Sequence, residues 1–223
     1  MVSQCTWDGT LSSEDFRFAA RAFSKRWKDT NPTLPQWMWI SQPKSSIFSL
    51  CEEEGYLSLE NIHYPRFTED YTTSCHLGSG EENVDCATMV LNDDQEMHIY
   101  DYHIVYNFSY KVPVLYFRGY QCDGQPLRSD EIQSDLPPCS LSILKDSKWT
   151  YMTQEEHPFL CRPWYMLHPC GTSEWIKLLF SNCGAMEGYV LHQYLPSWLS
   201  VVGQAVGLKI PLEVQNKSST SLH

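Results

Sequence analysis

The chain has 223 residues, of which 42% are hydrophobic and 13% aromatic, and its formal net charge is −11. This length suits one domain with a substantial core, which we expect over residues 1–214, followed by a disordered polar tail at 215–223. The acidic balance leaves no basic stripe that would bind a phosphate backbone. Nucleic acid is therefore not expected as a partner.

The nine cysteines indicate reduced thiols rather than a disulfide framework, because their number is odd, their spacing is irregular and the chain is long. The first ten residues lack the basic flank and apolar run of a signal peptide. No stretch approaches the roughly 20 apolar residues that span a bilayer. We expect a soluble, cytoplasmic protein without stable membrane insertion.

The first predicted element is an amphipathic helix at about residues 13–28. Ser12 fits an N-cap with Asp15 three residues later. Apolar side chains then recur with the helical period at Phe16, Ala19, Ala20, Phe23 and Trp27. We expect this stripe to pack on a sheet.

Short strands are predicted at 37–40, 47–51 and 56–62, with an acidic turn at 52–55, and together they suggest an antiparallel meander. The segment 67–97 contains eight acidic residues and no lysine or arginine. It is expected to form a solvated, mobile loop.

Potential metal ligands occur in this acidic segment at Cys75, His76 and Cys86. Their spacing fits no compact zinc site. We therefore predict no metal there, and the chain as a whole is predicted to need no cofactor.

Two long neighbouring strands are predicted at 100–110 and 112–120, followed by a short helix or ordered acidic loop at 129–136. A last helix should begin with Pro196 at its first position and stop at Gly207. The order of helix, antiparallel strands and helices predicts an α+β fold.

Cys170 is the best candidate for chemistry. It follows Pro169, and residues 171–174 resemble the start of a helix that runs to about Phe180. The positive end of a helix dipole favours the thiolate, which is the nucleophilic form. The alternative is a buried thiol that acts as a small hydrophobic residue, and both interpretations are open at this point.

A family resemblance is carried by four blocks of sequence, YHIVYNFSYKVPVLYFRGYQCDGQPL, TQEEHPFL, LHPC and YLPSWLSVVGQAVGLKIPL, which occupy residues 102–127, 153–160, 167–170 and 194–212. With them, the chain resembles the E2-like conjugating enzymes of autophagy, the family of autophagy-related protein ten. The resemblance implies an E2-like core, in which helices flank a curved antiparallel sheet.

The resemblance also implies a reaction. The cysteine of the His-Pro-Cys motif, here Cys170, would accept the C-terminal glycine of a ubiquitin-like modifier, autophagy-related protein twelve, as a thioester. An E1-like enzyme, autophagy-related protein seven, would supply it. The modifier would then pass to a lysine of autophagy-related protein five during autophagosome formation, without a separate E3.

Ordinary E2 enzymes place the asparagine of a His-Pro-Asn motif upstream of their cysteine, and this sequence has no such motif. His168 is the nearest substitute, either as a donor to the developing oxyanion or as the cap of a turn. Tyr106, Asn107 and Tyr110 lie in the matching strand block. They are candidates to approach the acceptor lysine, although aromatic residues in such strands usually belong to the core.

The predicted first helix has a basic edge opposite its apolar stripe, formed by Arg17, Arg21, Lys25 and Arg26. If the stripe packs on the sheet, this edge is left to steer an acidic surface of the E1-like enzyme. Arg21 and Lys25 are the candidates for this docking.

Three other interpretations compete with this one. The sister enzyme, autophagy-related protein three, conjugates a modifier to phosphatidylethanolamine. That enzyme has a long acidic insertion, for which this chain is too short. The residues after its cysteine also differ from residues 171–174 of this chain. A cysteine hydrolase would use Cys170 with His157 or His192 as base, but the sequence lacks a recognisable nucleophile motif. A non-catalytic E2-like binding module would not need the intact Cys170.

Overall fold

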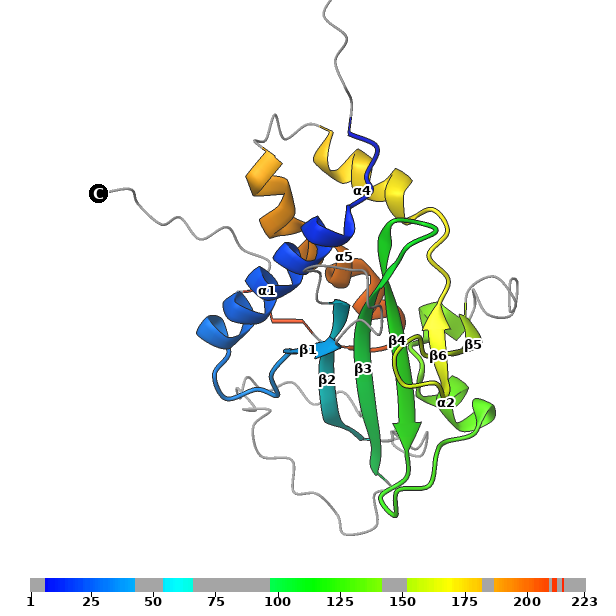
Figure 1. Ribbon diagram of the computed structural model, residues 1–223. Helices are drawn as coiled ribbons and strands as arrows, with labels where there is room; N and C mark the ends of the chain where they lie inside the picture. Colours follow the sequence, from blue (N-terminus) through cyan, green and yellow to red (C-terminus); the bar gives the residue numbers. More distant parts are fainter. Residues whose placement is uncertain are drawn as a thin grey trace, which may run out of the picture.

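The computed structural model describes residues 7–42, 54–65, 97–141, 152–181, 187–208, 210–211 and 214. Within these residues, one six-stranded antiparallel sheet with the order β1-β2-β3-β4-β6-β5 is flanked by helices (Figure 1). The predicted α+β class is confirmed.

The strands are β1 (Met38–Gln42), β2 (Glu54–Pro65), β3 (Met97–Asn107), β4 (Val112–Tyr120), β5 (Met152–Glu156) and β6 (Pro163–Leu167). The helices are α1 (Ser13–Thr30), α2 (Ser129–Asp135), α4 (Thr172–Phe180) and α5 (Glu187–Ala205). None of the helices in the described ranges is both long and apolar enough to span a bilayer.

Helix α1 begins at the predicted capping box. The Ser12 hydroxyl accepts the Asp15 N–H at 3.0 Å, and an Asp15 carboxylate oxygen accepts the Ser12 N–H at 3.3 Å. The helix continues two residues past the predicted end, to Thr30. Its predicted apolar stripe is buried along its whole length, at Phe16, Ala19, Ala20, Phe23 and Trp27.

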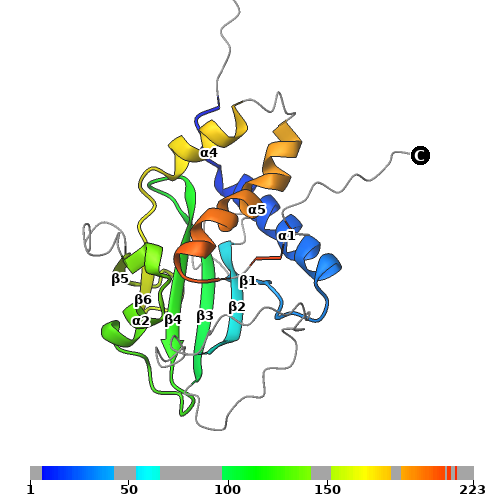
Figure 2. The ribbon, with the colours of Figure 1, turned by 180° about the vertical axis from the view of Figure 1, so that it is seen from behind.

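One face of the sheet carries the main core, and α1 and α5 lie over this face (Figure 2). Alternate residues of the central strands point into it: Leu57, Leu59, Tyr100, Tyr102, Ile104, Leu115 and Phe117. Helix α5 adds the buried side chains Tyr194, Leu195, Trp198 and Leu199. Successive side chains of a strand point to opposite faces of the sheet. Every second residue of these strands therefore faces the helices.

The prediction that Pro196 starts the last helix is wrong. Helix α5 begins at Glu187 and runs through Pro196. An interior proline removes one backbone hydrogen bond and costs about 3 kcal/mol. The aromatic and leucine side chains on both sides of Pro196 are fully buried, and each such burial contributes about 1.5–3 kcal/mol. Tertiary packing therefore outweighs the local signal. The predicted stop is confirmed, since Gly207 follows the helix with φ 72°.

Several strand boundaries differ from the predictions. Glu54 and Gly55, which were predicted in the acidic turn, begin β2, and Met97 begins β3 instead of ending a loop. Strands β5 and β6 were not predicted. Each has five residues, and neither alternates regularly between buried and exposed side chains, so the sequence pattern that indicates a strand is weak. The predicted strand at 47–51, the segment 66–96 and the tail at 215–223 lie outside the described residues.

The other face of the sheet carries a smaller core built around His103 and His157, which are 1% and 0% exposed. Nδ1 of His103 lies 3.0 Å from Nε2 of His157, and Trp164 stacks on His103 with ring centroids 4.2 Å apart. Nδ1 of His157 accepts the Phe159 N–H at 3.2 Å, so its proton is assigned to Nε2 and points at His103. Burial lowers the pKa of both imidazoles to about 3.

This outer core should make stability depend on pH. The unfolded chain protonates each histidine near pH 6.5, whereas the folded protein does so only near pH 3. Between these values the unfolded state binds more protons, so the stabilisation is complete above about pH 6.5 and is lost as the pH falls towards about 3.

We expect the free energy of urea unfolding to fall between about pH 7.5 and about pH 5, and to fall less steeply in His157→Asn. The asparagine oxygen retains an acceptor for the Phe159 N–H, so that local bond is kept while one titrating group is removed. Equal slopes in the two proteins would show that other groups set the acid sensitivity.

Candidate active site

Strand β6 leads directly to the candidate nucleophile. The strand ends at Leu167, and a turn at 168–171 joins it to α4. Gly171 is the N-cap of α4 with φ 75°, a left-handed conformation that glycine adopts without strain. The predicted helix start is confirmed. Cys170 stands exposed immediately before it, which disfavours a buried structural thiol.

His168 lies in the same turn. Its Nδ1 accepts the Cys170 backbone N–H at 3.2 Å, which assigns the proton of the neutral ring to Nε2. The ring meets Tyr110 edge-on, with centroids 5.7 Å apart. The side chain therefore caps the turn, and its Nε2–H is the group left for an oxyanion. The role in catalysis stays a prediction.

The acceptor-binding candidates lie on the β3–β4 hairpin and have different partners. The side-chain oxygen Oδ1 of Asn107 accepts the N–H groups of Ser109 and Tyr110, both at 3.0 Å, so Asn107 shapes the hairpin turn. The Tyr106 hydroxyl donates to the Leu11 carbonyl at 2.7 Å. Tyr110, 46% exposed, is the candidate whose ring reaches the cysteine turn. Contact of any of the three with an acceptor lysine stays a prediction.

The two histidines that a hydrolase would use as base are engaged elsewhere. Both ring nitrogens of His157 have partners in the outer core. His192 packs edge-on against Phe18 of α1, with ring centroids 5.1 Å apart. The described part of the chain contains no cluster of three or more histidine, cysteine or acidic side chains suited to a metal ion.

The predicted basic edge of α1 divides into two parts. Arg26 turns to α5, where its guanidinium donates to the Gln193 side chain at 3.3 Å. The Arg21 guanidinium lies over the Trp39 ring, 5.9 Å from its centroid. Arg21 and Lys25 are both exposed, which leaves them accessible to a docking partner.

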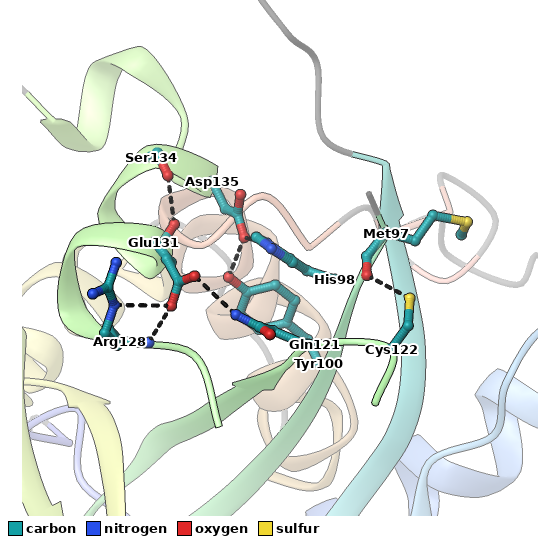
Figure 3. A network of polar contacts seen from close by, with 9 residues as sticks. All are labelled: Met97, His98, Tyr100, Gln121, Cys122, Arg128, Glu131, Ser134 and Asp135. Carbon is teal, nitrogen blue, oxygen red and sulfur yellow. Dashed lines mark hydrogen bonds and ion pairs between the residues drawn. The ribbon is translucent and has the colours of Figure 1, made fainter. Parts of the chain in front are cut away.

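A separate polar network joins α2 to the start of β3 (Figure 3). One Asp135 carboxylate oxygen accepts hydrogen bonds from His98 at 2.6 Å and from the Tyr100 hydroxyl at 2.5 Å. His98 also lines a cavity of about 520 Å³. At about 3.3 Å per residue, the network is roughly 25–30 Å along β3 from the hairpin. It fastens α2 and is not part of the cysteine site.

Sequence reasoning missed one neighbour of the site, residues 7–11, which pack on the first turn of α4. The available signal was Trp7 followed by Asp8 and Gly9, a turn-forming pair after a large aromatic residue. Such a pattern predicts a turn, but it does not indicate which helix the turn contacts.

Known proteins show where this chain belongs. The family model described as autophagocytosis associated protein, active-site domain, matches residues 15–213. The chain is 49% identical to the ubiquitin-like-conjugating enzyme ATG10 of Arabidopsis thaliana, covering 94% of this chain and 96% of that protein. It is 38% identical to the Homo sapiens enzyme of the same name, covering 60% of each. A crystal structure of the autophagic E2 ATG10 aligns with TM-score 0.42 and 14% identity, covering 90% of this chain and 99% of that one.

These findings define the class of the protein, an E2-like conjugating enzyme of autophagy. The chain belongs to the autophagocytosis-associated protein family that carries this active-site domain.

We expect His168→Ala to form its thioester but to discharge it about 10²–10³-fold more slowly, the usual cost of losing one oxyanion donor. His168→Asp separates the two roles, because its carboxylate can still accept the Cys170 N–H but has no N–H to donate to an oxyanion. Single-turnover chase of preloaded enzyme measures both variants. Full activity in the aspartate variant would identify His168 as a turn cap, and full activity in the alanine variant would exclude either role.

Proposed function

We propose that Cys170 accepts the C-terminal glycine of a ubiquitin-like modifier, autophagy-related protein twelve, and passes it to a lysine of autophagy-related protein five. The E1-like autophagy-related protein seven would supply the modifier. The observation that carries the assignment of the nucleophile is the exposure of Cys170 at the end of the His-Pro-Cys turn, directly before α4. The family membership supports the reaction class.

The chemistry consists of two acyl transfers. The Cys170 thiolate attacks the thioester carbonyl on the E1-like enzyme, whose own cysteine leaves as a thiolate. The acceptor amine then attacks the new thioester carbonyl, its proton passes to solvent, and Cys170 leaves as a thiolate while the isopeptide bond forms. The oxyanion of each step would lie near the positive end of the α4 dipole.

A protein lysine is favoured as acceptor over the phosphatidylethanolamine of the sister enzyme. The ATG10 relative from Arabidopsis thaliana is 49% identical to this chain, and the match covers 96% of its own length, which favours the ATG10 route over that of the sister enzyme. The exposed thiol likewise favours an enzyme over an inert E2-like module. We place the reaction in the cytoplasm, because a reducing compartment keeps the Cys170 thiol free to react.

We expect Cys170→Ser to trap the modifier as an oxyester that withstands hydroxylamine, whereas the wild-type thioester is cleaved by it. Cys170→Ala should abolish conjugation with little change in melting temperature, because it removes an exposed side chain. Cys122→Ala and Cys161→Ala, at two other exposed cysteines, are the matched controls and should load normally. The test is reconstitution with the E1-like enzyme, ATP and modifier on a non-reducing gel. Loading in Cys170→Ala would contradict the proposal.

Reversal of Arg21 and Lys25 to glutamate should slow loading at low salt and leave discharge of preloaded enzyme normal. Charges at the rim of an interface chiefly set the association rate, which salt screens. The control reverses Arg118 and Arg128, which changes net charge by the same amount away from α1. The measurement is the initial loading rate across a salt series. Equal rates for the two double variants would exclude this edge of α1 as the docking surface.

A further inference from the structure

Residues 7–11, the N-terminal strap, cross the first turn of the helix that follows the nucleophile. A Cβ added to Gly9 would stand 2.0 Å from the Ser173 carbonyl oxygen and 2.8 Å from its carbonyl carbon. Gly9 also has φ 88°. Contact this close is possible because residue 9 is glycine. The strap therefore meets the backbone of α4 three residues after Cys170.

The strap is anchored on both sides of this contact. The hydroxyl of Tyr194, a buried residue of α5, donates to the Gly9 carbonyl at 2.8 Å. The Leu11 N–H donates to the Lys111 carbonyl in the hairpin turn at 2.8 Å, and the Tyr106 hydroxyl donates to the Leu11 carbonyl at 2.7 Å. Two hydrogen-bonded tyrosines thus fasten one short segment to α5 and to the β3–β4 hairpin.

Trp7 extends the strap towards the other end of α4. Its ring meets Phe180 and Tyr194 edge-on, each with centroids 6.1 Å apart, and its indole N–H donates to the Thr10 carbonyl at 2.8 Å. Helix α4 needs such support, because its own contribution to the buried core is small. Thr172 and Ile176 are its buried residues, and the side chains in its last turn are largely exposed.

We propose that the strap is a positioning element for the transfer step, which holds the first turn of α4 in register with the hairpin that carries Tyr110. The inference rests on the proposed function. Aminolysis requires the thioester carbonyl on Cys170 to face groups on a separate element, so a small displacement of α4 should matter. Gly9, Tyr194 and Tyr106 are positioning residues and act through the backbone of the strap and α4.

Gly9→Ala is the first test. Real Cβ contacts essentially never fall below 3.0 Å, and this one would start at 2.0 Å, so the two backbones must separate by about 1 Å. A misplacement of that size can cost about 10²-fold in rate, and we expect a loss approaching this in single-turnover discharge. Gly124→Ala is the matched control: φ is 85°, and no atom lies within 4 Å of the added Cβ. Equal discharge by the two variants would overturn the proposal.

The second test removes one hydroxyl at a time. Tyr194→Phe and Tyr106→Phe should lower the discharge rate at saturating acceptor without changing the half-saturating acceptor concentration. Tyr100→Phe is the control, because it also loses one tyrosine hydroxyl hydrogen bond, of 2.5 Å to Asp135, in the network that joins α2 to β3 (Figure 3). If discharge simply follows melting temperature across the three variants, the strap contributes stability alone and the proposal fails.

A third measurement needs no partner protein. The rate of Cys170 alkylation by iodoacetamide at one fixed pH, followed on the Cys170 peptide by mass spectrometry, should change in Gly9→Ala and stay at the wild-type value in Gly124→Ala. A displaced first turn of α4 changes the backbone groups beside the exposed thiol and the access to it. Identical rates would overturn the inference even if wild-type enzyme formed no thioester, a result that would by itself refute only the proposed function.

Discussion

The position of the nucleophile depends on the attachment of β6 to the sheet. Strand β6 joins β4 through two residue pairs, Tyr116 with Met166 and Phe117 with Tyr165. Burial on both faces reinforces this short junction. Trp164 stacks on the outer histidine core, and Leu167 enters the main core. The outer core therefore serves the active site indirectly, since it clamps the strand whose end carries the cysteine turn.

Three parts of the chain meet around Cys170: the turn between β6 and α4, the tip of the β3–β4 hairpin, and the strap. Each is a short irregular segment held by a regular element behind it, which gives precise placement without enclosing the thiol. An E2-like enzyme must meet two large partners in succession, and an open site suits that requirement. Helix α1 has two faces with different roles. One face fills the core, and the other presents basic side chains at the surface.

Sequence reasoning succeeded where a local pattern decides the structure. The capping box and apolar stripe specified α1, and a continuous run rich in β-branched and aromatic residues specified β4 to the residue. It failed where distant contacts decide. The packing of α5 overrides Pro196, and the Tyr106 hydroxyl finds its partner 95 residues away in the chain. The motif located Cys170, but no local pattern could show that Gly9 touches the helix behind it.

The hydrogen bonds of the outer core run in one direction. The N–H of His157 points to His103, the remaining N–H of His103 points to the Ser58 hydroxyl at 3.0 Å, and that hydroxyl donates to Glu60 at 2.8 Å. Each donor thus has one acceptor. Replacing one histidine by an apolar residue leaves the other with an unpaired buried nitrogen, which costs about 1–3 kcal/mol. Replacing both removes that cost but takes the acceptor from the Phe159 N–H. Each of the two positions therefore constrains which side chain the other can carry.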